Sequence, residues 1–145
     1  MSAVGEVMLA LANRLRGAES LSYVKAVFLG QRESITAFPV IVLEPAKVRE
    51  EEDVYNRAEV FLDVLVMGFV NVANKDEQIV GMGRVVGVLD LLDDVKKAID
   101  EDRTLGGRVI HCFIGETRLG VVEYPVRGFE LDVSIRFRQR VGDRS

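Results

Sequence analysis

The sequence predicts an α+β domain: a mainly antiparallel sheet of long strands with two helices packed on one side. Three observations favour this class. Two segments place apolar residues at helical spacing, and several others alternate apolar and polar residues over long stretches. The helical segments do not alternate regularly with the strands, as they would in a parallel α/β fold. The predicted order along the chain is α-β-β-β-α-β-β.

The size and composition of the chain indicate one globular domain over residues 1–145. The sequence is 48% hydrophobic and 29% charged, with three prolines, and no repeat or linker divides it. Its apolar runs are too short or too interrupted by charge to span a bilayer, and no secretory signal pattern opens it. The single cysteine, Cys112, cannot form an intramolecular disulfide. We expect a soluble protein made in the cytoplasm, without membrane contact.

Two amphipathic helices are predicted. The first spans Ala3 to Arg16, with Ser2 as its N-cap and Gly17 as its end. The second begins at Asn74 or Asp76 and continues to the Gly106-Gly107 pair. Apolar residues at helical spacing mark its buried face: Ile79, Met82, Val85, Val86, Leu89, Leu92, Val95 and Ile99.

The predicted strands are rich in β-branched and aromatic residues or alternate in polarity. They span residues 21–29, 38–44, 55–70, 108–114 and 129–138. A polar stretch over residues 30–34 is typical of a turn between the first two. In the third strand Ala58, Val60, Leu62, Val64 and Val66 share one face, which we expect to line the core.

Four consecutive acids follow the second predicted strand: Glu50, Glu51, Glu52 and Asp53. Because they repel one another and cannot pack in a core, we predict a solvated, mobile loop. The run lacks the spaced ligands and the glycine of a calcium-binding loop, so a cation site is the less favoured interpretation.

Charged residues also recur on the solvent side of the long strands. Glu59 and Asp63 lie about 13 Å apart by strand rise, too far for a glycosidase carboxylate pair. The last strand alternates its apolar residues with Glu130, Asp132, Arg136 and Arg138. Cross-strand ion pairs are one explanation. A charged surface facing a neighbouring subunit or a lumen is the other.

Residues 115–127 form a projecting loop or hairpin in this prediction, because Gly120 and Pro125 interrupt an otherwise apolar stretch. A loop of this composition must be buried against something. Either it folds onto its own core or it docks on a neighbour through Leu119, Val121, Val122 and Tyr124.

No pattern in the sequence indicates catalysis, a cofactor or a metal. The glycines between Gly81 and Gly87 lie inside the second predicted helix, where small residues favour close packing on the sheet over nucleotide binding. Neighbours on a strand face opposite ways, so His111 and Cys112 cannot act as a dyad. The net charge of −4 argues against nucleic acid as the main partner. We expect no catalytic, cofactor-binding or metal-ligating residues.

This layout resembles the tail terminator or tail completion proteins of long-tailed bacteriophages. The resemblance spans nearly the whole chain and consists of pattern matches without signature residues. It is carried by the first helix, the Phe38-Pro39-Val40-Ile41-Val42 strand, the long strand over residues 57–69, the helix over residues 77–100 and the Phe129-Glu130-Leu131-Asp132-Val133 strand.

The resemblance implies a virion protein that forms a hexameric ring at the head-proximal end of the tail. Such a ring joins the tail tube protein to the head-side connector protein and stops tube polymerisation, without catalysis or cofactor. DNA is then only passing cargo. The implied interface regions are the acidic run at Glu50 to Asp53 and the segment from Thr117 to Arg127. A closed ring would also protect the exposed edges of long strands.

Two alternatives stay open at this point. One is another virion component of similar topology, such as a tube or connector protein. The other is a small ligand-binding α+β domain with a pocket between sheet and helices.

Overall fold

The computed structural model describes residues 1–31, 34–53 and 55–141. Its strands are β1 (Ala26–Leu29), β2 (Val40–Glu52), β3 (Arg57–Asn71), β4 (His111–Glu123) and β5 (Val126–Arg140). They form one five-stranded sheet in the order β1-β2-β3-β5-β4, in which only the β1–β2 pair is parallel. The helices are α1 (Ala3–Gly17), α2 (Lys75–Val80) and α3 (Val88–Asp100), with a short 3-10 turn at Glu19–Leu21. The predicted α+β class and the mainly antiparallel sheet are confirmed.

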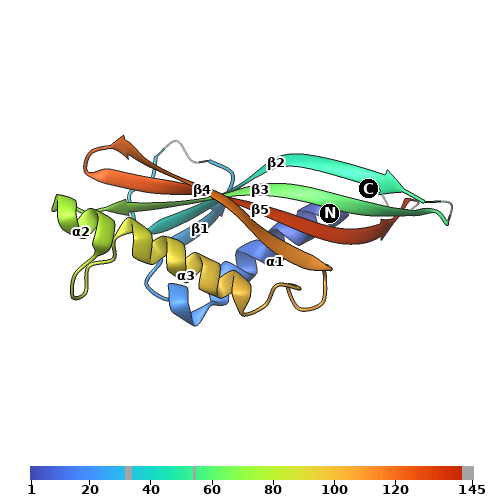
Figure 1. Cartoon of the computed structure of the whole chain (residues 1–145), viewed down its shortest axis with the longest axis horizontal. Helices are drawn as coiled ribbons and strands as arrows, with labels where there is room; N and C mark the ends of the chain where they lie inside the picture. Colours follow the sequence, from blue (N-terminus) through green and yellow to red (C-terminus); the bar gives the residue numbers. More distant parts are fainter. Residues whose placement is uncertain (32–33, 54, 142–145) are drawn as a thin grey trace.

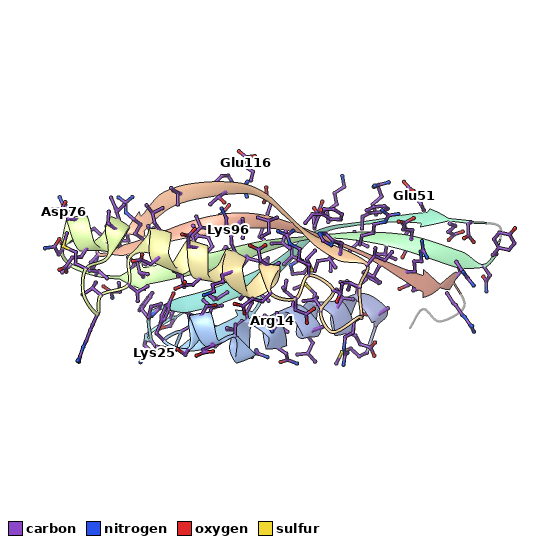
Figure 2. All side chains as sticks on the ribbon, turned by 60° about the horizontal axis from the view of Figure 1, so that its bottom comes forward. Arg14, Lys25, Glu51, Asp76, Lys96 and Glu116 are labelled. Atoms are coloured by element: carbon purple, nitrogen blue, oxygen red, sulfur yellow. The ribbon has the colours of Figure 1, made fainter. Side chains whose placement is uncertain are left out.

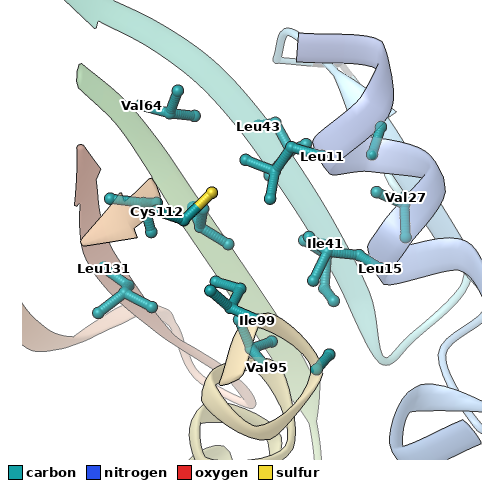
Figure 3. Close-up of a cluster of buried hydrophobic side chains, with 14 of the residues drawn as sticks. Leu11, Leu15, Val27, Ile41, Leu43, Val64, Val95, Ile99, Cys112 and Leu131 are labelled. Atoms are coloured by element: carbon teal, nitrogen blue, oxygen red, sulfur yellow. The ribbon is translucent and has the colours of Figure 1, made fainter. Parts of the chain in front are cut away.

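The domain has two layers, with α1 and α3 on the same face of the sheet (Figure 1). The central strand β3 turns its predicted core residues, from Ala58 to Val66, toward the helices, and all are at most 1% exposed. Leu11 and Leu15 of α1 pack beside Ile41 and Leu43 (Figure 3). Nearby, α3 brings Val95 and Ile99 into the same cluster as Cys112 and Leu131.

Helix α1 has the predicted start and N-cap but ends one residue later than predicted. The Ser2 Oγ accepts a hydrogen bond from the Gly5 N–H at 2.9 Å, which satisfies one of the free amides of the first turn. The helix includes Gly17 and is capped by Ala18. Its buried residues are Val7, Met8, Leu11, Ala12 and Leu15.

The prediction of one long second helix is wrong. Two helices, α2 and α3, occupy this part of the chain, and residues 81–87 separate them. Gly81 and Gly83 have φ of 71° and 60°, in the left-handed region that favours glycine. A Cβ at Gly81 would lie 2.7 Å from the Val85 carbonyl oxygen, so the chain closes tightly on itself there. The glycines therefore break the helix, and the prediction that they pack a continuous helix on the sheet is wrong.

Several strand boundaries also differ from the prediction. The first strand is shorter, because residues 19–21 form a 3-10 turn, and β4 begins at His111 rather than Arg108. The segment predicted as a projecting loop or hairpin is a hairpin, in which β4 and β5 meet at Tyr124-Pro125. In the predicted turn over residues 30–34, Arg32 and Glu33 lie outside the described residues.

Most of the acidic run is strand, so the prediction of a loop there is wrong. Strand β2 continues to Glu52, beyond the predicted end at residue 44. Glu50, Glu51 and Glu52 belong to β2 and pair in register with Val60, Glu59 and Ala58 of β3. Only Asp53 lies in the turn that follows. Repulsion between the carboxylates is tolerated because all four residues are exposed, while the β3 backbone supplies a ladder partner.

Substituting Gly68 by alanine should destabilise the domain. A Cβ there would lie 2.6 Å from Phe129 Cζ and 2.9 Å from Leu91 Cδ2, so α3 would be pushed away from the sheet. We expect a loss of about 1–3 kcal/mol in the free energy of unfolding, measured by urea denaturation. Gly17→Ala is the matched control, because nothing lies within 4 Å of its Cβ position. Equal stability of the two variants would contradict the tight packing at Gly68.

Candidate assembly surfaces

The sheet face that α1 and α3 leave uncovered is called the outer face here. Residues paired in register share a face, so the partner positions of β3 and β5 define it. All six residues of the predicted charged sheet face lie on it: Glu59, Asp63, Glu130, Asp132, Arg136 and Arg138. The structure thus brings these residues together on one surface.

Cross-strand polar contacts link the charged residues of this face. Glu59 of β3 forms an ion pair with Arg136 of β5. The Ser134 hydroxyl donates to the Asp63 carboxylate at 2.8 Å. These contacts confirm that cross-strand pairing accounts for part of the charge pattern, including an ion pair between the third and last strands.

Arg118 of β4 completes the ion pairs on this face. Its guanidinium donates to both Asp132 oxygens, at 2.8 and 3.0 Å, and to Glu130 at 3.3 Å. Arg118 was not predicted on this face, because its segment was predicted to be a projecting loop or hairpin with no assigned register. The alternating acids Glu130 and Asp132 were the available signal, since they call for a basic partner on a neighbouring strand.

One transverse row of the outer face combines arginine and aromatic side chains. Arg49, Phe61, Arg136 and His111 occupy matching register positions on β2, β3, β5 and β4. The Arg49 and Arg136 guanidinium carbons lie 4.2 and 5.7 Å from the Phe61 ring centroid, within cation–π range. This row also escaped sequence analysis, since it depends on the register between strands.

The Arg118 ion pair has an electrostatic consequence for Asp132. Hydrogen bonds from the guanidinium lower the pKa of the Asp132 carboxyl, while the two carboxylates raise the pKa of Arg118. A carboxyl with a lowered folded-state pKa stabilises the fold above its unfolded pKa, near 3.9, and loses that contribution as the pH falls through the folded value.

Asp132→Asn should therefore reduce the acid dependence of stability. The urea midpoints of wild type and variant should differ above the unfolded pKa of about 3.9 and converge as the pH falls below it; the difference is small because the pair is exposed. The control is Glu116→Gln, which changes an exposed carboxyl without an ion-pair partner among the described residues. A constant difference between wild type and Asp132→Asn at all pH values would contradict this linkage.

The acidic tip, Glu50 to Asp53, lies at one end of the elongated molecule. Figure 2 shows Glu51 there, at the opposite end from Asp76 of α2. The Asp53 carboxylate shapes the tip by accepting hydrogen bonds from the Tyr55 and Arg57 amides, at 2.8 and 3.2 Å. Arg49 pairs with Glu51, so the tip is not uniformly negative.

The β4–β5 turn and α2 form the other end, called the hairpin end here. Leu119, Val122 and Tyr124 are 55%, 64% and 55% exposed, so these residues do not fold onto the core of their own chain. The side chain of Val121, the fourth apolar residue predicted here, lies outside the described residues. Three further exposed apolar residues lie in α2 and the adjoining loop: Ile79, Val80 and Met82. The prediction that Ile79 and Met82 lie on a buried helix face is wrong, because the helix ends at Val80.

A buried amide attaches α2 to the hairpin. Gln78 is 2% exposed, and its Nε2 donates to the carbonyl oxygens of Pro125 at 2.6 Å and Val72 at 3.3 Å. Its Oε1 accepts from Arg127 at 3.1 Å. The Tyr124 hydroxyl adds a bond of 2.5 Å to the Ala73 carbonyl. These contacts hold the apolar residues of α2 beside those of the hairpin.

Gln78→Ala should detach this end from the sheet, because it removes the side-chain donor to the Val72 and Pro125 carbonyl oxygens and leaves Pro125 only the Val72 N–H. The expected loss is about 1–3 kcal/mol in the free energy of unfolding, together with faster amide exchange in α2. Asp76→Asn, on an exposed position of the same helix, should change stability by less than about 0.5 kcal/mol. Unchanged exchange in α2 would show that Gln78 does not anchor it.

The described residues contain no arrangement typical of an active site. Cys112 is fully buried, and burial raises the pKa of its thiol to about 11. His111 precedes it on β4 and contacts Phe113, with ring centroids 4.7 Å apart. No group of three or more potential metal ligands occurs in the described ranges. None of the helices described is long and apolar enough to cross a membrane.

The outer face carries an apolar groove of about 720 Å³ near the hairpin end. Val42, Met67 and Phe69 line it from the sheet, with Phe38 on one side and Tyr124 on the other. Its lining has a single acidic pair, Glu123 and Glu130, and no histidine or cysteine. The groove can accept apolar groups but lacks converging catalytic side chains.

Comparison with known proteins identifies the fold but no family. No family model and no curated protein sequence matches this chain. Among solved structures, it is similar to a chain from the virion of a native gene transfer agent particle, with a TM-score of 0.59 and 14% identity. The match covers 91% of this chain and 94% of that chain. The two proteins share a fold over nearly their whole lengths.

Proposed function

We propose that this chain is a structural virion protein that caps a phage tail tube as a homohexameric ring, ends tube polymerisation and provides the surface for head–tail joining. The observation that carries the proposal is the fold shared, almost end to end, with a chain of a gene transfer agent virion. Because the match covers nearly all of both chains, it favours two proteins of the same architecture over a similarity limited to one subdomain.

The two ends of the molecule support a role between different partners. The acidic tip presents carboxylates with arginines close by, whereas the hairpin end presents exposed apolar side chains. A ring of parallel subunits would gather each kind of end on its own face. One face could then complement the last tube ring, while the other offers the connector a surface that further tube subunits do not fit.

The mechanism requires binding and no chemical step. Partners at each face would be selected by complementary charge and apolar contact. The negative net charge would keep DNA, the passing cargo, from adhering to the ring. In this proposal the protein lies at the head-proximal end of the virion tail.

One feature favours a second candidate, a small ligand-binding domain. The apolar groove beside Met67 and Phe69 is large enough for a small molecule. Thermal stabilisation by a compound from a metabolite panel, lost on substituting Met67 by a larger residue, would support that function. Another virion component, a tube or connector protein, is a further alternative. Self-polymerisation of the chain into long tubes would identify it as a tube protein.

The decisive experiment mixes the purified chain with its tube protein and measures assembly by native mass spectrometry and electron microscopy. We expect ring-sized oligomers that bind tube ends and stop elongation at a fixed length. A chain that remains monomeric and leaves tube growth unchanged would overturn the proposal.

Charge reversal at the acidic tip tests the contribution of that end. The Glu50→Lys/Glu51→Lys/Glu52→Lys variant should lower the affinity for the partner that docks at this end at least tenfold. It replaces three exposed carboxylates and spares the turn-forming Asp53. The control is Glu6→Lys/Glu19→Lys/Asp93→Lys, which changes the net charge equally on the helical layer. Equal binding by both variants would remove the tip from the interface.

A further inference from the structure

The edges of the sheet differ in how they are protected. An open edge presents unpaired N–H and C=O groups that can pair with another chain, and soluble proteins normally block it. Here β1 and β4 are the two outermost strands. The second half of β2 is a third open stretch, because β1 pairs with it only as far as Leu43.

Arginines cover two of these edges. Arg16 of α1 donates to the Val27 carbonyl of β1 at 2.7 Å. At the start of β4, the Cys112 N–H donates to the Arg103 carbonyl at 2.9 Å, and the Arg103 guanidinium donates to the Cys112 carbonyl at 3.0 Å. A single residue therefore satisfies both backbone groups that Cys112 turns away from β5.

The rest of β4, from Thr117 to Glu123, has no such cover from the residues that the structure describes. Along a strand, the backbone N–H and C=O groups of successive residues point alternately to one neighbouring strand and to the other. The β5 partners of Cys112, Thr117 and Leu119 are Ile135, Leu131 and Phe129, which are separated by even numbers of residues and so point the same way. The Thr117 and Leu119 backbone groups therefore face the open side, as those of Cys112 do. Within the described ranges no hydrogen bond reaches them there.

The side chains around this stretch define what could pair with it. Leu119 is 55% exposed, and a Cβ at Gly120 would meet nothing within 4 Å. Gly120 and Gly128 floor a hollow of about 290 Å³ beside Phe69. The charges near this edge are mainly negative, because Arg118 and, on the helix side, Arg127 stand against four acids: Glu116, Glu123, Glu130 and Asp132.

The open part of β2 carries the complementary pattern. In the segment Pro45–Arg49, Lys47 and Arg49 are exposed on the outer face, although Arg49 also pairs with Glu51. Val48 between them is 46% exposed and lies on the helix side, in register with Leu62. The segment therefore offers basic groups on one face and an apolar group on the other.

We propose that a second copy of this chain lays its Pro45–Arg49 edge along the Thr117–Glu123 edge of β4. Val48 then packs beside Leu119, and Lys47 and Arg49 approach the acids of the neighbouring outer face. Strands β2 and β4 run antiparallel within one copy. When copies are related by rotation about a ring axis, β2 of one copy therefore runs antiparallel to β4 of the next. This inference rests on the proposed ring and names its subunit interface, which is head-to-tail and closes by rotation.

The backbone contact is tested by Leu119→Pro, because proline removes the open-edge N–H without removing a ladder bond to β5. Oligomerisation, measured by sedimentation and native mass spectrometry over a concentration series, should weaken at least tenfold. Leu119→Ala keeps the N–H and should weaken it less. Circular dichroism establishes that each variant is folded.

A charge-swap pair tests the identity of the two edges. Lys47→Glu and Glu116→Lys/Glu123→Lys should each assemble poorly alone, because each places like charges across the interface. An equimolar mixture should regain assembly, with the two variants alternating. Failure of the mixture to assemble better than either variant alone would overturn the pairing of these edges.

Hydrogen exchange on the wild-type chain provides a readout that needs no variant. The amides of residues 46–49 and 117–123 should exchange more slowly in the oligomer than in the monomer; Pro45 has no amide hydrogen to follow. Oligomers that leave both segments unprotected, or that persist in all variants, would overturn the edge pairing while leaving the ring. A wild-type chain that stays monomeric with and without the tube protein would overturn both proposals.

Discussion

The fold depends on the pairing of β3 with two long neighbours. All fifteen residues of β3 are in register with β5, and twelve of its positions pair with β2. Because side chains alternate along it, one face supplies the apolar row on which α1 and α3 pack, and the other supplies the outer face. A slip of one residue would exchange these two faces, so the buried row from Ala58 to Val66 fixes the register of the sheet.

This constraint explains which parts of the structure the sequence could predict. The alternation in β3 and β5 is unambiguous, and the first helix carries its own cap at Ser2. Helical spacing alone, however, continued through residues 81–87, where backbone conformation at Gly81 and Gly83 ends the helix. The charge of the acidic run alone predicts a loop, because it carries no information about the partner strand. Only the β3 ladder shows that Glu50 to Glu52 are extended.

The candidate surfaces were predictable to different degrees for the same reason. The charged residues of β3 and β5 were assigned to the solvent side because alternation along a single strand reveals a face. Their partner Arg118 was not, since it reaches Glu130 and Asp132 only through the register of neighbouring strands, as Arg49 reaches the Phe61 ring. Gln78, which attaches α2 to the hairpin, was hidden in an ordinary helical pattern.

Burial of the single cysteine makes the folded chain suitable for site-selective labelling. The thiolate is the reactive form of cysteine, and Cys112 is both inaccessible and held protonated near neutral pH by its raised pKa. Maleimide dyes or spin labels attached to a cysteine introduced on either end of the molecule would therefore report on that position alone. The native thiol would become reactive only when the sheet opens, so its modification would measure unfolding within an assembled particle.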